Sequence, residues 1–215
     1  MLTPFIAMLK AIGEPHRVLS REETARELGT AYYQASVHTP GCVLMNPAAL
    51  TRGLADALPE NVTLYENSPV IAYERENGVR LTTPGGSIVA PRMIIAVNAF
   101  AERFGYWKGR LLPFEAQASL TRPLTDAEHA LIGSVKPWGL TPVNAFVSTT
   151  MRLTAGRRIM VRYFLRYSPE QRTSAARLEA IRAAHLKVLR SRFPMLPDLG
   201  LEHTWTGYVC LSRNN

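Results

Sequence analysis

The chain has 215 residues, of which 47% are hydrophobic and 20% are charged, and its formal net charge is +8. This composition is typical of a folded globular protein with one substantial core, so it argues against a disordered chain. No apolar stretch approaches the roughly 18 residues that a membrane span requires. The N-terminal run MLTPFIAMLKAIGEP lacks the basic start and the cleavage site of a signal peptide.

The two cysteines and the charge distribution bear on the cellular setting and on partners. Cys42 and Cys210 have no metal-ligand spacing, and we expect them to be reduced thiols of a cytoplasmic protein. From Thr150 onward there are 12 Lys or Arg against 4 Asp or Glu. A basic half is compatible with nucleic acid, an anionic membrane or an acidic ligand, and equally with a solvated helix face. No nucleic-acid motif accompanies the charge, so we expect no nucleic-acid partner.

The first half of the chain predicts two helices followed by short strands. Ser20 and Glu23 form a capping box for a helix over residues 21–28, and an extended stretch covers 32–46. Asn46-Pro47 begins a second helix, whose expected buried stripe is Leu50, Leu54 and Leu58. Five β-rich runs follow, separated by the turn signals Asn77-Gly78 and Pro84-Gly85-Gly86; the runs are 63–66, 69–76, 79–83, 87–90 and 93–97. The last run has no polar alternation, which predicts a strand buried on both faces.

The second half predicts an antiparallel sheet with one long helix. Strands are expected at 111–124, 144–154, 157–167 and 201–215, with a short helix capped by Thr125 and Glu128 and a loop at 133–142. Ser168 and Gln171 predict the cap of the long helix, which ends before Phe193-Pro194. We expect His185 on its apolar face, and His38 beside a Pro-Gly turn, to be structural histidines. The fold class expected is α+β.

Recognisable catalytic motifs are absent from the sequence. It contains no GxGxxG, no GxxxxGK[ST], no HExxH and no GxSxG. No hydrolytic or phosphoryl-transfer mechanism and no metal site can be assembled from known parts, and the sequence identifies no catalytic residue.

Five segments in a fixed order do carry a resemblance. They are NPAALTRGLADAL, VTLYENSPVIAYERENGVRLTTPGGSIVAPRMIIAVNAF, LLPFEAQASLTRPL, TTMRLTAGRRIMVR and RFPMLPDLGLEHTWTGY. Over roughly residues 15 to 213 the chain resembles the D-amino-acid-oxidase-like superfamily of FAD oxidoreductases, which includes glycine and sarcosine oxidases. Within it, the chain is most similar to the γ-glutamylputrescine oxidoreductase type. The resemblance implies FAD as cofactor and a small amine or amino acid as substrate, oxidised by hydride transfer to the flavin.

The resemblance also implies a role for individual residues. Val70 would meet the adenine of FAD through its backbone, and Ala96, Val97 and Asn98 would pass near the dinucleotide, with Asn98 where relatives usually have glycine. Without the family, core packing is the simpler explanation for Val70 and Ala96.

On the substrate side, the resemblance places Met151 and Arg152 where relatives carry an aromatic residue before an arginine. Arg152 would orient a substrate carboxylate, and a surface arginine is the alternative. Trp205 and Gly207 match the family's tryptophan-x-glycine, just before the chain returns to the flavin. Trp205 would equally serve as a core aromatic.

The resemblance further implies that residues 1–110 form a partial FAD-binding domain and residues 111–215 a truncated substrate-binding domain. The glycine-rich N-terminal unit and the C-terminal segment that closes over the flavin are not found. We therefore expect this stretch alone to bind FAD weakly or not at all, to lack turnover, and to self-associate through an uncovered surface. The alternatives are a non-catalytic domain that binds a small ligand or a partner subunit and, less favoured, a basic nucleic-acid-binding domain.

Overall fold

The computed structural model describes residues 2–75, 77–143 and 148–212. The chain forms two compact units, each described by itself: the sheet unit, Met1–Leu44 with Trp107–Asn215, and the meander unit, Met45–Tyr106. The sheet unit contains α1 Leu2–Ala11, β1 Arg17–Leu19, α2 Arg21–Leu28, β2 Ser36–His38, β6 Leu111–Thr121, α4 Asp126–Leu131, β7 Trp138–Leu140, β8 Thr149–Leu153, β9 Ile159–Tyr167, α5 Ala175–Arg192 and β10 Leu201–Ser212. The meander unit contains α3 Pro47–Asp56, β3 Ala72–Glu74, β4 Val79–Thr83, β5 Gly86–Ala90 and the 3₁₀ helix η1 Asn98–Phe104.

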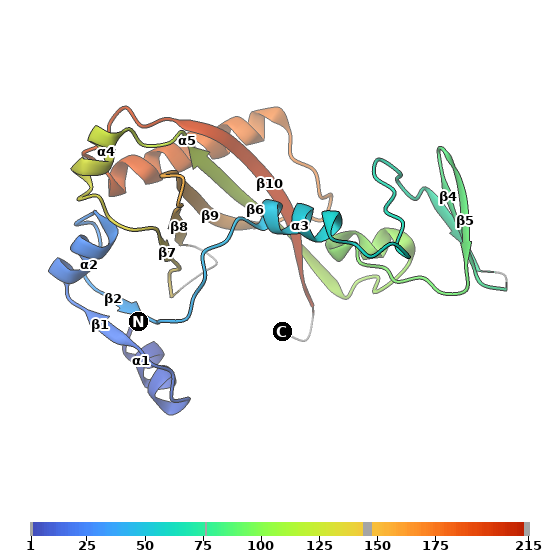
Figure 1. The fold of residues 1–215 in the computed structure, drawn as a ribbon, viewed down its shortest axis with the longest axis horizontal. Helices are drawn as coiled ribbons and strands as arrows, with labels where there is room; N and C mark the ends of the chain where they lie inside the picture. Colours follow the sequence, from blue (N-terminus) through green and yellow to red (C-terminus); the bar gives the residue numbers. More distant parts are fainter. Residues whose placement is uncertain (1, 76, 144–147, 213–215) are drawn as a thin grey trace. The chain divides into compact units, whose positions relative to one another are not determined.

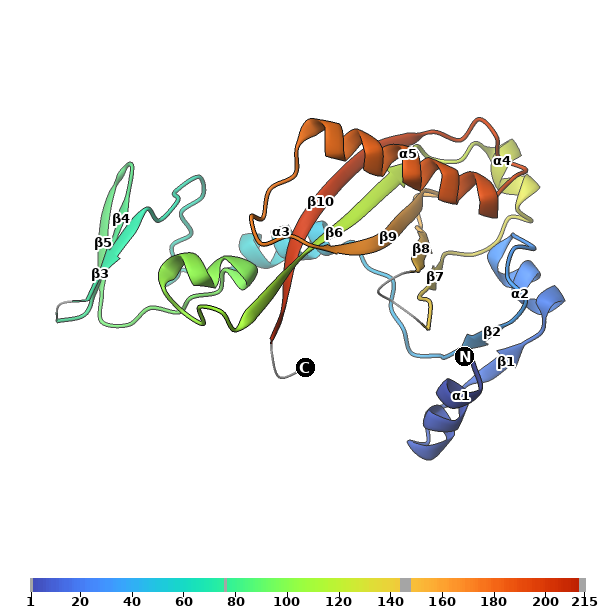
Figure 2. The same ribbon diagram turned by 180° about the vertical axis from the view of Figure 1, so that it is seen from behind.

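The sheet unit is built around a five-stranded antiparallel sheet in the order β10-β6-β9-β8-β7. Helix α5 lies across one face of this sheet (Figures 1 and 2). The predicted strands at 111–124, 157–167 and 201–215 correspond to β6, β9 and β10, and the α+β class is confirmed. Of the strand predicted at 144–154, β8 forms the part from Thr149, while residues 144–147 lie outside the described residues. The predicted loop at 133–142 contains the short edge strand β7.

The main core lies between α5 and the sheet. Leu189 of α5 and Phe193, the residue that caps its C-terminus, pack on Met151, Ile159 and Val161 of β8 and β9, and all five are buried. Each fully buried aliphatic side chain of this kind stabilises the fold by about 1.5–3 kcal/mol. The core therefore fixes α5 firmly against one side of the sheet.

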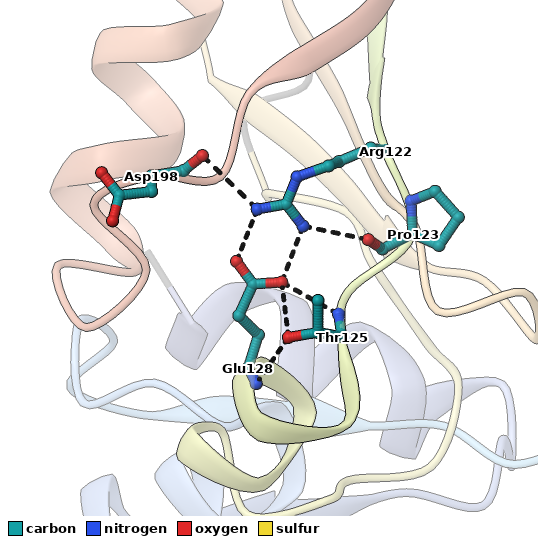
Figure 3. Close-up of polar contacts among 5 residues, drawn as sticks. All are labelled: Arg122, Pro123, Thr125, Glu128 and Asp198. Atoms are coloured by element: carbon teal, nitrogen blue, oxygen red, sulfur yellow. Dashed lines mark hydrogen bonds and ion pairs between the residues drawn. The ribbon is translucent and has the colours of Figure 1, made fainter.

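Capping boxes begin two helices where the sequence predicts them. In α2, Ser20 Oγ accepts from the Glu23 backbone N–H at 3.2 Å, and Glu23 returns a bond to the Ser20 N–H at 2.8 Å. Thr125 and Glu128 do the same for α4, and Arg122 adds a bidentate contact to Glu128, with both N···O distances 2.7 Å (Figure 3). One carboxylate thus caps a helix and joins it to the end of β6.

The predicted start of the long helix is wrong. Helix α5 begins at Ala175 with Ser174 as cap, six residues after the expected Ser168. The Ser168 N–H instead donates to the Pro113 carbonyl, and Gln171 has a φ of +51°, which is incompatible with a helix. Tertiary contacts with β6 therefore hold residues 168–174 in a loop.

Two N-terminal elements have no counterpart among the predicted ones. Helix α1 covers Leu2–Ala11, and β1 pairs antiparallel with β2 over three residues. The apolar run that the sequence shows at residues 2–11 is thus a helix with Leu9 buried. Strand β1 was too short to be recognised without its partner strand.

The meander unit confirms the predicted hairpins but not the flanking strands. β3, β4 and β5 form an antiparallel sheet, with Asn77 (φ +50°) and Gly78 (φ +124°) in the first turn. The runs 63–66 and 93–97, predicted as strands, are not strands, and Ile94 is 92% exposed. The expected buried stripe of α3 is also wrong, because Leu50, Leu54 and Leu58 are 48%, 63% and 40% exposed. An apolar pattern specifies which face favours burial, but burial requires a second surface.

Candidate active site

The face of the five-stranded sheet that points away from α5, called here the distal face, is the candidate site. Strand alternation assigns its residues, because Ser119 of β6 contacts His185 of α5 and its neighbour Ala118 therefore points the opposite way. Register then places a row across four strands, in which Trp205 pairs with Ala118, Ala118 with Arg162, and Arg162 with Thr150. A neighbouring pair on the same face joins Gly207 and Ala116.

The centre of the distal face is lined by small residues. Gly207 lies inside β10 beside Ala116, with Ala118 in the next row. A Cβ built at Gly207 would meet no atom within 4 Å. Glycine inside a strand weakens it, and it often marks a bulge, a bend or a site where a ligand or another backbone approaches closely. Trp205, 45% exposed, stands beside this small-residue patch. The surface above Gly207 is therefore open.

Arg152 of β8 lies further along the same face, held by neutral acceptors. Its Nη1 donates to the carbonyls of Leu140 and Met151, each at 2.8 Å, and its Nη2 lies 3.4 Å from Thr141 Oγ1. Burial and then the nearby charge of Arg162 lower the pKa of Arg152 from its ordinary value. Since arginine stays protonated in proteins, this guanidinium is a partly desolvated cation.

Gly139 makes room for the Arg152 side chain. The two residues pair between β7 and β8, and a Cβ at Gly139 would lie 3.1 Å from Arg152 Cδ and 3.2 Å from its Nε. The side chain thus lies across the edge strand. A side chain at position 139 would displace it.

Arg162 of β9 is the second guanidinium on this face, and the sequence did not single it out. Its Nη2 donates to Thr150 Oγ1 at 3.1 Å. Within the described residues neither Arg152 nor Arg162 forms an ion pair, whereas Arg122, Arg158 and Arg166 each meet a glutamate. The alternation of RRIMVR could have indicated the face of Arg162, but not its strand partner.

A buried polar network supports the sheet from the α5 side. Glu115 has no exposed surface; it accepts from Thr173 Oγ1 at 2.6 Å and Gln117 Nε2 at 2.8 Å, with Arg166 Nη2 at 3.4 Å. Burial favours a higher pKa for Glu115, but these hydrogen bonds outweigh it and hold the pKa below its usual value. The ionised Glu115 joins β6, β9 and the loop before α5, which keeps the sheet in register.

His185 belongs to the same interior. It is fully buried, its Nδ1 lies 2.8 Å from Ser119 Oγ, and burial lowers its pKa. This placement beneath the sheet agrees with the structural role expected for it, while His38 lies at the end of β2 with its side chain exposed.

The structure separates the other predicted site residues. Met151 is fully buried in the core on the α5 side, so it cannot touch a ligand on the distal face, and we do not retain it as a substrate contact. Val70 precedes β3 in the meander unit, where Ala96 and Val97 also lie outside any strand. Asn98 has a φ of +48°, in the left-handed region that glycine and asparagine tolerate best. The glycine that the resemblance led us to expect at this position would adopt the same conformation.

The described residues contain neither a candidate metal site nor a candidate membrane-spanning helix. No group of three His, Cys, Asp or Glu side chains there is arranged to hold a metal ion. None of the helices described is long and apolar enough to cross a bilayer.

Comparison with known proteins gives one family and a consistent set of folds. The family model described as FAD dependent oxidoreductase matches residues 2–215. The probable oxidoreductase OrdL of Rhizobium meliloti (strain 1021) is 29% identical over 94% of this chain, and the chain covers 46% of that protein. The chain therefore spans about half the length of this relative.

Two solved structures share the fold. Glycine oxidase from Geobacillus kaustophilus superimposes with a TM-score of 0.71 at 20% identity, over 97% of this chain and 54% of that one. Iminodiacetate oxidase (IdaA) from Chelativorans sp. BNC1 gives 0.69 at 19% identity, over 93% and 52%. At these identities the likeness concerns the fold alone.

Proposed function

Since this chain belongs to the family of FAD dependent oxidoreductases, we propose that its five-stranded sheet forms the substrate-side wall of an enzyme that oxidises a small amine or amino acid. FAD would supply the hydride-accepting chemistry for oxidation of the carbon next to the amine nitrogen. The observation that carries the proposal is the distal face, where the open position at Gly207 pairs with Ala116 and the next row holds Trp205, Ala118 and Arg162.

On this proposal, each residue of the distal face has a task that its geometry supports. Gly207 and Ala116 admit the flavin ring, and Trp205 limits water access at the edge of the patch. Arg152 binds the substrate carboxylate through the donors that Leu140 and Met151 leave unused, and so fixes the amine-bearing carbon. Val70, Ala96, Val97 and Asn98 remain predictions for the dinucleotide contact. No residue is assigned as a catalytic base, since hydride transfer from a neutral amine requires none.

The substrate class rests on two kinds of support. Glycine oxidase and iminodiacetate oxidase, by their names, act on small amino or imino acids. The resemblance of the sequence segments to the γ-glutamylputrescine oxidoreductase type keeps that type within the proposal. A cytoplasmic location, suggested by the free Cys42 and Cys210, is likewise proposed.

A further proposal assigns different roles to the two halves of the chain. We propose that residues 1–110 serve FAD binding and residues 111–215 substrate binding, although the compact units divide at residues 44 and 106. The exposed leucines of α3 support a further proposal, that the purified chain self-associates through this face.

The test is an FAD titration of the purified chain, followed by visible absorbance after desalting and by quenching of tryptophan fluorescence. Gly207→Val should weaken FAD binding at least tenfold because its side chain occupies the space of the flavin ring. Gly200→Val is the matched control, since Gly200 also has no atom within 4 Å of its Cβ position but precedes β10. Equal effects of the two substitutions on FAD binding would contradict the proposed site.

A further inference from the structure

The distal face holds an excess of positive charge that one substrate carboxylate does not balance. Arg152 and Arg162 lie on adjacent strands, and register sets them diagonally, because Arg152 pairs with Met160 and Arg162 with Thr150. Diagonal neighbours of this kind have Cα atoms roughly 7–8 Å apart. Long arginine side chains easily bring their guanidinium groups closer than that.

The two guanidinium groups have only neutral partners in the described part of the chain. Arg152 donates to the carbonyls of Leu140 and Met151, and Arg162 donates to the hydroxyl of Thr150. Both arginines are half-buried, which weakens their solvation, and each repels the other. Arg122 and Arg158 of the same unit, by contrast, each meet a glutamate, Glu128 and Glu202. Arg152 and Arg162 are neighbours on one face, and no carboxylate of the described residues compensates their charge.

We propose that the distal face binds substrates with two carboxylates, that is, dicarboxylic amino or imino acids. This inference rests on the proposed function. Arg152 binds the carboxylate next to the reacting carbon, and Arg162 binds the second carboxylate. A substrate with one carboxylate leaves one guanidinium uncompensated, so it binds more weakly.

The spacing favours two carboxylates over a single compact dianion. Two anionic groups on a short chain can each meet one guanidinium in a bidentate manner. The oxygens of a phosphate all surround one atom, so a phosphate offers the two guanidinium groups no separate anionic groups, and the titration below includes it as a competing ligand. Gly139 has no side chain, which leaves room for the Arg152 side chain to lie across β7.

Calorimetric titration of the purified chain tests the inference without turnover. The probes are iminodiacetate, glutarate, acetate and inorganic phosphate at one ionic strength. We expect both dicarboxylates to bind at least about tenfold more tightly than acetate. Arg162→Gln should reduce this ratio to about twofold or less, and Arg190→Gln, on the exposed side of α5, should leave it unchanged. If Arg162→Gln does not fold by circular dichroism, Arg162→Lys replaces it and should weaken glutarate binding while retaining part of the ratio.

Each other outcome has a definite meaning. Dicarboxylates that bind no better than acetate, or a ratio that survives Arg162→Gln, would overturn the inference. Phosphate binding as tight as that of glutarate, with the same dependence on Arg162, would also overturn it and assign a general dianion site. The FAD titration with Gly207→Val is independent, so flavin binding without dicarboxylate preference refutes only the inference. Dicarboxylate preference together with equal effects of Gly207→Val and Gly200→Val on FAD binding refutes only the proposed flavin site.

Discussion

Gly29 ends α2 where a side chain has no space. Its φ is +71°, and an added Cβ would lie 2.5 Å from the Ile132 carbonyl oxygen and 2.8 Å from the Ile132 Cβ. Gly13 follows α1 with the same φ, but no atom lies within 4 Å of its Cβ position. Comparison of Gly13 with Gly29 therefore separates the cost of the left-handed backbone from the cost of a close neighbouring atom.

Gly13→Ala should lower the free energy of unfolding by about 1–2 kcal/mol, the cost of a left-handed non-glycine residue. Gly29→Ala should cost at least about 2 kcal/mol more, because the backbone of Ile132 must shift as well. Urea denaturation followed by circular dichroism measures both. Equal losses for the two substitutions would show that α2 and α4 are not packed together at this point.

At the scale of elements, the Arg122–Glu128 pair stabilises α4 and its attachment to β6. The contact to Arg122 and the hydrogen bonds from Thr125 lower the pKa of Glu128 to about 2. A carboxyl with a lowered pKa stabilises the fold fully above its ordinary value of 4.5. That contribution is lost as the pH falls from about 4.5 to about 2.

Glu128→Gln should lower the free energy of unfolding at pH 7 by about 1–2 kcal/mol, from the helix cap and the partly exposed ion pair. The difference between wild type and variant should shrink as the pH falls from 4.5 toward 2. Glu27→Gln is the control, because Glu27 and Arg17 are more than half exposed and 3.6 Å apart, and it should change stability by less than about 0.5 kcal/mol. If the difference in free energy of unfolding between wild type and Glu128→Gln did not change with pH, the charge of Glu128 would not be its cause.

Local signals in the sequence predicted where helices begin better than they predicted which distant segments pair with each other. The capping residues Ser20, Asn46 and Thr125 each begin a helix as expected, since a side-chain cap depends only on its neighbours. Ser168 failed as a cap because its backbone pairs with Pro113, far away in the chain. Long-range pairing decided this case, and a single sequence does not reveal it.

The candidate site shows the same limit at the scale of the whole molecule. Family resemblance indicated Arg152, Trp205 and Gly207, and all three lie on the distal face, whereas the adjacent Met151 lies in the core. Arg162 joined them only once the register of β8 against β9 was known. A shift of one residue in that register would place Arg162 under α5, so the sequence alone could not have paired the two arginines.

The exposed apolar surface of the meander unit leads to a prediction for the molecule in solution. Leu50 and Leu54 of α3 and Leu58, which follows the helix, recur every four residues and are all exposed, and Ile94 is almost wholly exposed. Surfaces of this kind associate in water because apolar area is removed from contact with solvent. We expect the weight-average mass, measured by light scattering, to rise with concentration in the micromolar range.

Leu54→Lys should shift this association to higher concentration without lowering the melting temperature, because Leu54 is 63% exposed and contributes little to the core. Met8→Lys is the matched control, since Met8 is 48% exposed on α1 of the other unit. A wild-type chain that stays monomeric throughout, or an equal effect of both substitutions, would show that the α3 face is not the associating surface. The net charge of +8 opposes association at low ionic strength, so added salt should strengthen the association of the wild-type chain. Leu54→Lys should remain more monomeric than the wild-type chain at each salt concentration.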